Sequence, residues 1–307
     1  LRFVCTLDMT RKVFLRHMKL GVLYQRVTGK ELEGAHDALN DSRGCGRVYP
    51  YLRDKHPVLK EIGVPKIVLK ASDVAGIIGR SQYRPPLEVA DELWSKYMPS
   101  TFTGKTKEQI AMKAISTSNV AQDLLRDADQ FKSTNSSSVE QKFRAVSNQL
   151  EKNSGLQKDE LDATRDHIRK TLYTNHGTRH EKTTADNYEN MHEDPAFYKY
   201  DVCTIKGTLY QVVGRIDRVR NNEDGTKTLV EIKNRARGLF RAVRDYEEIQ
   251  CQTYMEMLGM DECALIEQHN DKRLTHNIKR DRHMWNEQIL PALRNFCERF
   301  HDMLSTH

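Results

Sequence analysis

Between residues 104 and 175, apolar positions recur at helical spacing within a strongly polar stretch. Thr106 and Gln109 fit a capping box, which predicts a helix over the apolar run that follows them. The stretch "STNSSS", residues 133 to 138, predicts a linker. The spacing beyond it predicts two further helices. The apolar face of the first carries Val139, Phe143, Val146 and Leu150, and the second carries Leu161, Ile168 and Leu172.

The rest of the chain combines strand and helix patterns. Near residue 71, Ser72 can cap a short helix. Residues 200 to 233 are typical of strands, residues 240 to 259 of a helix, and "ECALIEQHN" of a further strand. The chain then forms an amphipathic helix, bent near Pro291, whose apolar stripe is typical of core packing. That stripe consists of Trp285, Ile289, Leu293, Phe296 and Phe300.

Composition and charge narrow the class of protein. The chain has 307 residues, 38% of them hydrophobic and 30% charged, which indicates a globular protein of one or two domains. It has no run of about 18 apolar residues and no secretory signal, so neither a membrane span nor export is predicted. The six cysteines include no C-x-x-C pair, which argues against a zinc site and favours a reduced, intracellular protein. The net charge of +6 permits a polyanionic partner without requiring one.

A charged hairpin holds the candidate chemistry. The sequence "VGRIDRVRNNEDGTKTLVEIKNR", residues 213 to 235, combines two β-rich runs with an Asp-Gly turn between them. A hairpin centred on that turn places Asp217 opposite Glu231. Because strand side chains alternate between the faces of a sheet, Asp217, Glu231 and Lys233 then share one face. A register shift of one residue would separate them.

Two interpretations of this hairpin are open on spacing alone. Two carboxylates at close range repel each other, and a Mg²⁺ ion, which prefers oxygen ligands, removes that repulsion. A neighbouring lysine can then orient a water for attack on a phosphodiester. A cross-strand salt bridge on a solvated face accounts for the same residues equally well.

Further positions extend the pattern. Glu181, in "HGTRHEKTTADNYE", is predicted at a helix start before the sheet, and Gln250 and Tyr254 lie at i and i+4 on one helical face. The ordered set of Glu, Asp, Glu-x-Lys and Gln-x-x-x-Tyr resembles the PD-(D/E)XK nuclease superfamily, and within it the lambda exonuclease/YqaJ group of viral recombination nucleases. "ASDVAGIIGRSQY" is similar to that group's Ser-Asp helix and Gly-x-x-x-Tyr turn, so the resemblance covers roughly residues 66 to 270.

The resemblance implies a fold, a reaction and a set of site residues. The implied fold is α/β (α+β), a mixed central sheet flanked by helices, in a domain of residues 60–307 with a helical insertion at about 104–175. The implied reaction is Mg²⁺-dependent hydrolysis of duplex DNA from 5′ to 3′, with Mn²⁺ as a substitute ion. Glu181, Asp217, Glu231 and the Ile232 carbonyl would bind the metal, Lys233 would position the attacking water, and Gln250 and Tyr254 would support the site.

The same resemblance implies partners and a setting. It implies duplex DNA as substrate, a single-strand annealing protein as partner, and action in viral recombination, repair or replication. The location would then be the host nucleus or a cytoplasmic replication site. The helical insertion is longer than in lambda exonuclease, so the trimeric ring of that enzyme does not follow from the resemblance, and the oligomeric state is open.

Basic residues around the hairpin fit a nucleic-acid path. Arg215, Arg218 and Arg220 flank Asp217, and Arg235, Arg237, Arg241 and Arg244 follow Lys233. Such clusters contact phosphates without reading sequence, although a solvated charged face is the alternative. Ser72 belongs to the helix that the group places at its DNA channel. Lys66 and Lys70 lie near, but do not match, the group's arginine for a terminal 5′-phosphate. The residues predicted to bind nucleic acid are therefore Ser72, Lys66, Lys70, Arg215, Arg235 and Arg237.

The N-terminal segment, residues 1–50, resembles the last part of a DnaQ-like (DEDDh) exonuclease. His36 and Asp41 match the final His-x-x-x-x-Asp of that family. The earlier acidic motifs, which complete its two-metal site, are missing from this chain, so the segment is interpreted as an inactive remnant or as the C-terminal part of a truncated domain. By spacing alone, a helix with a surface histidine and aspartate fits nearly as well.

Two other classes of function stay open for the main domain. One is a non-catalytic DNA-binding protein on a nuclease fold, against which the intact Asp and Glu-x-Lys set argues. The other is an RNA-degrading enzyme similar to viral alkaline nucleases. The metal and phosphate contacts of DNA and RNA cleavage are shared, so the motifs do not separate these two substrates.

Overall fold

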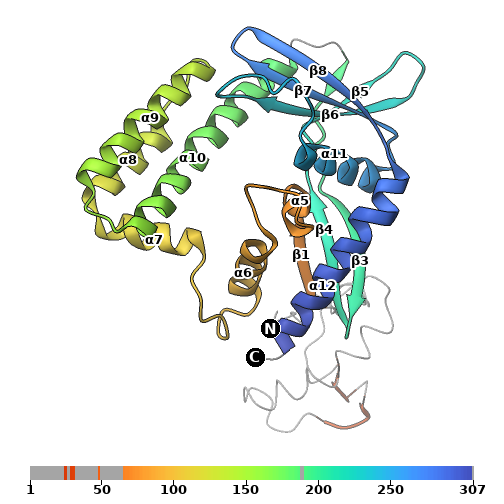
Figure 1. Cartoon of the computed structure of the whole chain (residues 1–307). Coiled ribbons are helices and arrows are strands. Elements are labelled where there is room, and N and C mark those ends of the chain that lie inside the picture. The colour runs from red at the N-terminus through yellow and green to blue at the C-terminus, as the bar shows by residue number, and fades with distance from the viewer. Residues whose placement is uncertain (1–23, 26–27, 32–47, 49–64, 187–189, 306–307) are drawn as a thin grey trace. The chain divides into compact units, whose positions relative to one another are not determined.

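The computed structural model describes residues 24–25, 28–31, 48, 65–186 and 190–305 (Figure 1). The chain divides into two compact units, one of Leu1–Lys66 and Thr204–Leu209, the other of Ile67–Cys203 and Tyr210–His307. His36 and Asp41 lie outside the described residues, and with them the motif on which the predicted DnaQ-like remnant rests.

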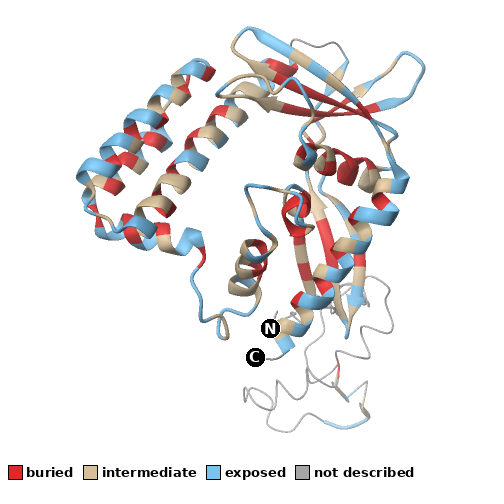
Figure 2. Cartoon of the chain, viewed as in Figure 1, coloured by how far each residue is buried: buried red, intermediate tan, exposed pale blue. Residues whose placement is uncertain are grey.

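The described strands form two sheets, and their order gives a mixed α/β fold, as predicted. One sheet has the order β1-β4-β3, and its strands are Lys66–Lys70, Thr208–Gly214 and Tyr198–Ile205 in that order. The other has the order β2-β5-β6-β7-β8, formed by Met191–His192, Arg218–Asn221, Lys227–Asn234, Glu262–His269 and Lys272–Lys279. Strands β6 and β7 are parallel, and the other pairs of this sheet are antiparallel. Figure 2 shows the burial of β6 and β7, whose central residues are covered on both faces.

One predicted strand is two strands in the structure. The run "VGRIDRVR" is broken after Gly214, where β4 ends, and resumes at Arg218, where β5 begins in the other sheet. A Cβ on Gly214 would lie 2.5 Å from Cε1 of Tyr254 and 2.9 Å from Cβ of Ala71. The backbone therefore passes too close to these side chains for any residue but glycine, and Asp217 lies in the break between the sheets.

The helical middle segment has the predicted apolar faces. Its helices are α7 (Lys107–Thr117), α8 (Asn119–Gln130), α9 (Ser136–Asn153) and α10 (Lys158–Ala185), preceded by α6 (Pro86–Tyr97). Thr106 and Gln109 form the predicted capping box. The predicted apolar stripes are buried in one core cluster, which includes Val139, Phe143, Val146, Leu150, Ile168 and Leu172. Helix α10 runs without a break past residue 175, the predicted end of the insertion.

Two predictions about local structure in this unit need correction. Only the first half of "STNSSS", residues 133–135, links α8 to α9, because Asn135 and Ser138 form a capping box and α9 begins at Ser136. The start of α9 also contacts the β7–β8 turn, where Asn270 Oδ1 accepts a hydrogen bond from the Ser136 amide at 3.0 Å. Ser72 does not cap a helix but lies inside a 3₁₀ turn, η1 (Ala71–Asp73), that leads into α5 (Val74–Ile77).

The C-terminal part follows the predicted pattern, with one strand added. Helix α11 (Asp245–Leu258) is followed by the predicted β7 and then by β8, whose polar sequence gave no strand signal because it lies at the edge of the sheet. A π-helical turn (Met284–Ile289) precedes α12 (Leu290–Ser305). Trp285, Ile289, Leu293 and Phe300 are buried as predicted, whereas Phe296, the fifth residue of the predicted stripe, is only half-buried. Among the described residues, no helix has both the length and the apolar character needed to cross a bilayer.

Candidate active site

Asp217 and Glu231 approach each other at the junction of β5 and β6. Arg218 pairs with Val230 and Val219 with Leu229, so the same register carries Asp217 opposite Glu231, as predicted. Asp217 Oδ2 accepts the Ile232 amide at 2.7 Å, and Lys233 Nζ donates to Glu231 Oε1 at 2.6 Å. The alternate residues of β6 face the other way, into a core cluster of Ala185, Val230, Ile232, Ala264 and Ile266.

Helix α11 adds Gln250 to this group. Its Nε2 donates to Glu231 Oε1 at 2.9 Å, and its Oε1 accepts from Lys233 Nζ at 3.3 Å. Glu231 is buried, and its other oxygen, Oε2, has no hydrogen-bond partner among the described residues. Tyr254 lies one turn along the same helix face, against Gly214. Burial and the nearby charge of Glu231 raise the pKa of Tyr254, so its hydroxyl stays protonated.

Glu181 reaches the group from α10. It lies near the C-terminal end of that 28-residue helix, so its predicted place at a helix start is wrong. Gly177 lies inside α10 although a glycine costs a helix about 1 kcal/mol. The Gly177 carbonyl accepts a hydrogen bond from Asn234 at the end of β6. Arg218 Nη1 donates to Glu181 Oε1 at 2.7 Å, and Arg218 Nη2 donates to Glu193 Oε1 at 3.2 Å.

The site concentrates negative charge around one lysine. Burial, and then the charge of Asp217, raises the pKa of Glu231 to about 7. Burial also raises the pKa of Asp217, against the opposing effect of Lys233. Burial alone would lower the pKa of Lys233, but the carboxylates of Glu231 and Asp217 outweigh it and raise that pKa. Lys233 is therefore a permanent cation between two carboxylates that resist ionising together.

These residues fit a divalent metal ion. Oxygen ligands are available from Asp217, from the unpartnered Glu231 Oε2 and from the Ile232 peptide beside them. A buried carboxylate oxygen without a donor is costly unless a cation completes its surroundings. In the part of the chain that the structure describes, no cluster of three or more acidic, histidine or cysteine side chains is arranged to hold a metal by itself. The donor set suits a divalent ion that prefers oxygen ligands and keeps several of its waters.

Comparison with known proteins assigns the family. The sequence matches the model of the PD-(D/E)XK nuclease superfamily over residues 111–302. The chain belongs to this superfamily. The match includes Glu181, Asp217, Glu231, Lys233 and Gln250, which are the residues that the structure brings together. Members of the superfamily generally use divalent metal ions, in agreement with the donor set of the site.

Solved structures resemble this PD-(D/E)XK chain only distantly. The crystal structure of SSO0001 has a TM-score of 0.35 and 12% identity, covering 59% of this chain and 84% of its own. An alkaline exonuclease (LHK-Exo) from Laribacter hongkongensis has a TM-score of 0.34 and 15% identity, covering 64% and 95%. Its complex with dAMP has a TM-score of 0.34 and 14% identity, covering 65% and 95%. No curated protein sequence matches the chain.

The predicted nucleic-acid contacts of this PD-(D/E)XK chain fall into two groups. Lys66 and Lys70 lie at the two ends of β1, with Ser72 in the turn beyond it, and Lys70 and Ser72 are exposed. Arg215 is exposed, with its guanidinium 4.4 Å from the Phe197 ring centroid. Two other arginines, Arg237 and Arg235, are held by carboxylates. Arg237 Nε donates to Glu140 Oε2 of α9 at 3.1 Å, although most of its side chain is exposed.

Arg235 does not have the exposed position that its predicted phosphate contact requires. Its guanidinium lies 2.6 Å from Glu247 Oε1 and 2.7 Å from Glu267 Oε1, and both carboxylates are buried. Arg218, one of the basic residues predicted to line a nucleic-acid path, is likewise buried and pairs with Glu181 and Glu193. No sequence signal predicted Glu247 and Glu267 as internal partners, because acids on a helix and near a strand end are usually solvated.

The Arg235→Ala variant is expected to lower the free energy of unfolding by about 3–5 kcal/mol, because it leaves Glu247 and Glu267 buried without their cation. Urea denaturation followed by circular dichroism measures this loss. Arg237→Ala is the control: the Arg237 side chain is mostly exposed and Glu140 keeps Arg144 and Tyr173 as partners, so the loss should be up to about 1 kcal/mol. Equal losses in the two variants would contradict the buried role of Arg235.

The affinity for a divalent ion is expected to rise with pH through about 7. In the metal-free protein Glu231 has a pKa of about 7, so below that pH its proton must be displaced before the carboxylate can act as a ligand. Each unit below pH 7 should lower the apparent affinity by up to about tenfold, and the dependence should level off above about pH 8. Calorimetric titration with Mn²⁺ measures it. An affinity that stays the same between about pH 6 and about pH 8 would contradict the raised pKa of Glu231.

Proposed function

We propose that the chain is a Mg²⁺-dependent nuclease that hydrolyses phosphodiesters of duplex DNA as a 5′-to-3′ exonuclease. One observation carries the proposal. Asp217, Glu231 and Lys233 meet on one face of β5 and β6, and the buried Glu231 Oε2 there has no hydrogen-bond donor. A solvated cross-strand salt bridge, the alternative for the same residues, would not bury Glu231 and leave one of its oxygens without a partner.

The metal ligands in this proposal are Asp217, Glu231 and the carbonyl oxygen of Ile232. A bound divalent ion supplies positive charge to the phosphoryl group and lowers the pKa of a water molecule. Glu181 adds a further carboxylate, which Arg218 holds at 2.7 Å. For Glu181 to act as a ligand, its carboxylate must exchange the guanidinium of Arg218 for the ion.

Lys233 is the proton-bearing group of the proposed site. Its raised pKa keeps the ammonium group charged, so it donates hydrogen bonds and cannot itself ligate a metal. Two of its contacts, Glu231 Oε1 at 2.6 Å and Gln250 Oε1 at 3.3 Å, fix the direction of Nζ. From that position Nζ can orient the attacking water or hold a phosphate oxygen. Gln250 orients both Lys233 and Glu231, and Tyr254 supports Gln250 from the next turn of α11.

The preference for duplex DNA and the 5′-to-3′ direction rest on the resemblance of the sequence motifs. The same holds for the viral role, the single-strand annealing partner and the intracellular replication site. The geometry of the site supports phosphodiester hydrolysis, which DNA and RNA cleavage share.

Digestion of end-labelled nucleic acids tests the proposal. Duplex DNA labelled at either end, with and without a 5′-phosphate, is incubated with Mg²⁺ or with EDTA beside a duplex RNA of the same sequence. We expect Mg²⁺-dependent release of nucleotides from the 5′ end of DNA. Faster cleavage of RNA would favour the ribonuclease alternative, and cleavage that persists in EDTA would contradict the metal-dependent mechanism.

A further inference from the structure

The connection between β6 and α11 carries four of the chain's arginines. It has the sequence "RARGLFRAVR", residues 235–244, and is called the arginine loop below. It begins at the end of the strand that carries Lys233 and ends at the start of the helix that carries Gln250. The arginine loop therefore borders the candidate active site.

A buried carboxylate holds the backbone of the arginine loop. Glu267 of β7 has no exposed surface, and its Oε2 accepts the amides of Phe240 at 3.1 Å and Arg241 at 3.2 Å. Its Oε1 accepts Arg235 Nε at 2.8 Å. Hydrogen bonds from backbone amides to a buried charge are stronger than those between neutral groups, so the Glu267 carboxylate stabilises one conformation of the loop.

The backbone of Arg241 has a conformation that arginine rarely adopts. Its φ is +61°, in the left-handed region that glycine and asparagine occupy more readily. Holding a bulky residue there costs free energy, and the Glu267 carboxylate at the Arg241 amide offsets that cost. The arginine loop thus keeps a strained residue whose charged side chain is exposed. A glycine at this position would adopt the positive φ at a lower cost in free energy. The presence of an arginine there therefore indicates a role for its guanidinium group.

The four arginines of the loop differ in their partners. Arg235 pairs with Glu247 and Glu267, and Arg237 pairs with Glu140. Among the described residues, neither Arg241 nor Arg244 forms an ion pair with a carboxylate, and both are exposed.

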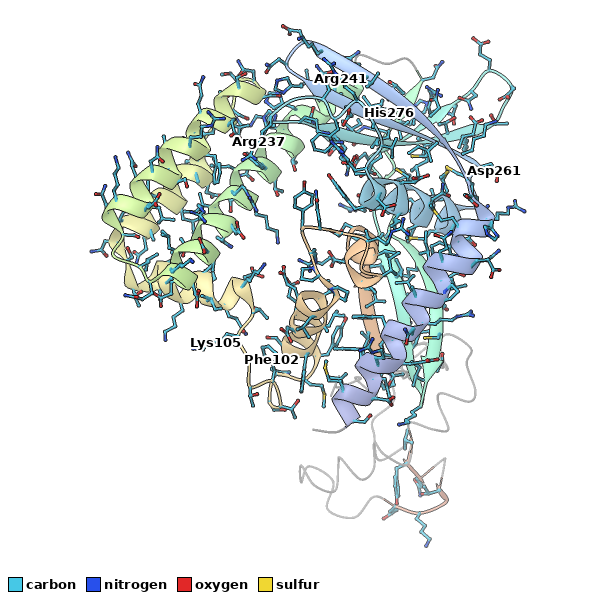
Figure 3. The ribbon with its side chains drawn as sticks, in the orientation of Figure 1. Phe102, Lys105, Arg237, Arg241, Asp261 and His276 are labelled. Atoms are coloured by element: carbon cyan, nitrogen blue, oxygen red, sulfur yellow. The ribbon has the colours of Figure 1, made fainter. Side chains whose placement is uncertain are left out.

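An aromatic ring orients one of the two exposed guanidinium groups. The guanidinium of Arg244 lies 4.8 Å from the Phe240 ring centroid, and that of Arg235 lies 4.0 Å from the same centroid. The arginine loop therefore holds two positive charges that no carboxylate of the described residues neutralises. Figure 3 labels Arg241 and Arg237 of this loop.

We propose that the arginine loop binds the phosphate backbone of duplex DNA beside the cleaved bond, through Arg241 and Arg244. This inference rests on the proposed nuclease function. Guanidinium groups bind phosphate in a forked geometry, and contacts of this kind position a duplex without reading its sequence. An exonuclease that removes successive nucleotides needs such sequence-independent contacts. The internal ion pairs of Arg235 then serve to hold the loop, whereas Arg241 and Arg244 meet the substrate.

The double variant Arg241→Asn/Arg244→Ala tests this surface. Asparagine tolerates a positive φ, so the first change removes the charge while keeping the backbone conformation. Binding of a short fluorescein-labelled DNA duplex is followed by anisotropy without divalent metal, so that no strand is cut. We expect at least about a tenfold weaker binding, and a salt dependence whose logarithmic slope falls by about 1.8, for two phosphate contacts at about 0.9 each.

A matched control removes the same amount of charge elsewhere. Arg126 and Arg169 are exposed on α8 and α10, and the Arg126→Ala/Arg169→Ala double variant should bind the duplex within about twofold of the wild type, with an unchanged slope. Arg241→Lys, which keeps the positive charge, should retain most of the affinity. Equal binding by the loop variant and the control variant would overturn the inference.

Failure of the arginine loop and failure of the nuclease assignment give different results. If the loop variant binds DNA normally while Asp217→Ala abolishes cleavage, the loop inference is wrong and the nuclease assignment stands. If the loop variant loses binding while Asp217→Ala cleaves normally, the loop stands as a DNA-binding surface and the assignment of the active site is wrong.

Discussion

The Asp217→Ala variant is expected to lose phosphodiester cleavage by roughly a thousandfold or more, because a metal ligand supplies several kcal/mol of transition-state stabilisation. Binding of duplex DNA should change little, since phosphate contacts come from arginine and lysine. The fold should also persist, because removal of Asp217 relieves the charge that raises the pKa of Glu231. Cleavage of a labelled duplex with Mg²⁺ and binding in EDTA measure the two effects separately.

Glu223→Ala is the matched control for Asp217→Ala. Glu223 is an exposed acid in the turn of the same hairpin, so this variant removes one carboxylate without touching the site. It should cleave at the wild-type rate. Near-normal cleavage by purified, folded Asp217→Ala protein would show that the acids of this hairpin do not hold a catalytic metal.

The Lys233→Ala variant is expected to lose at least about a hundredfold in the cleavage rate, the usual size of a positioned proton donor's contribution. Mn²⁺ should still bind, because the ammonium group of Lys233 is not a ligand. Removal of this cation also frees Glu231 Oε1 from a competing 2.6 Å contact. Single-turnover cleavage and calorimetric titration with Mn²⁺ together separate the loss of rate from the loss of metal.

Lys227→Ala provides the comparison for Lys233→Ala. Lys227 is exposed at the opposite end of β6, so its loss should leave both cleavage and metal binding unchanged. If Lys233→Ala protein no longer bound Mn²⁺, Lys233 would be a structural support of the metal site and its proposed role with the water or phosphate would be wrong.

The core of the candidate site is predictable because it depends on short-range rules. The Asp-Gly turn fixes the register of β5 and β6, and alternation along a strand then places Asp217, Glu231 and Lys233 on one face. Gln250 and Tyr254 follow from helical periodicity in the same way. Each of these positions is set by residues close to it in the sequence.

Other features depend on contacts between distant segments, and local patterns misplace them. The break at Gly214 arises because Tyr254 and Ala71 occupy the space beside it. The length of α10, and with it the position of Glu181, is maintained by packing that overrides the weak helix propensity of Gly177. Arg235 turns inward because Glu247 and Glu267, from two other elements, bury their charges against it. The composition of the loop alone predicts an exposed phosphate contact there.

Titration with Mn²⁺, followed by the paramagnetic resonance signal of the free ion, tests most directly whether Asp217 and Glu231 form a metal site. The isosteric variants Asp217→Asn and Glu231→Gln keep the shape of the site and remove one negative charge each. We predict that the wild type and Glu223→Gln bind Mn²⁺ saturably, whereas Asp217→Asn and Glu231→Gln bind it at least about tenfold more weakly. Equal binding by all four proteins, or no binding by the wild type, would contradict the metal site on which the proposed function depends.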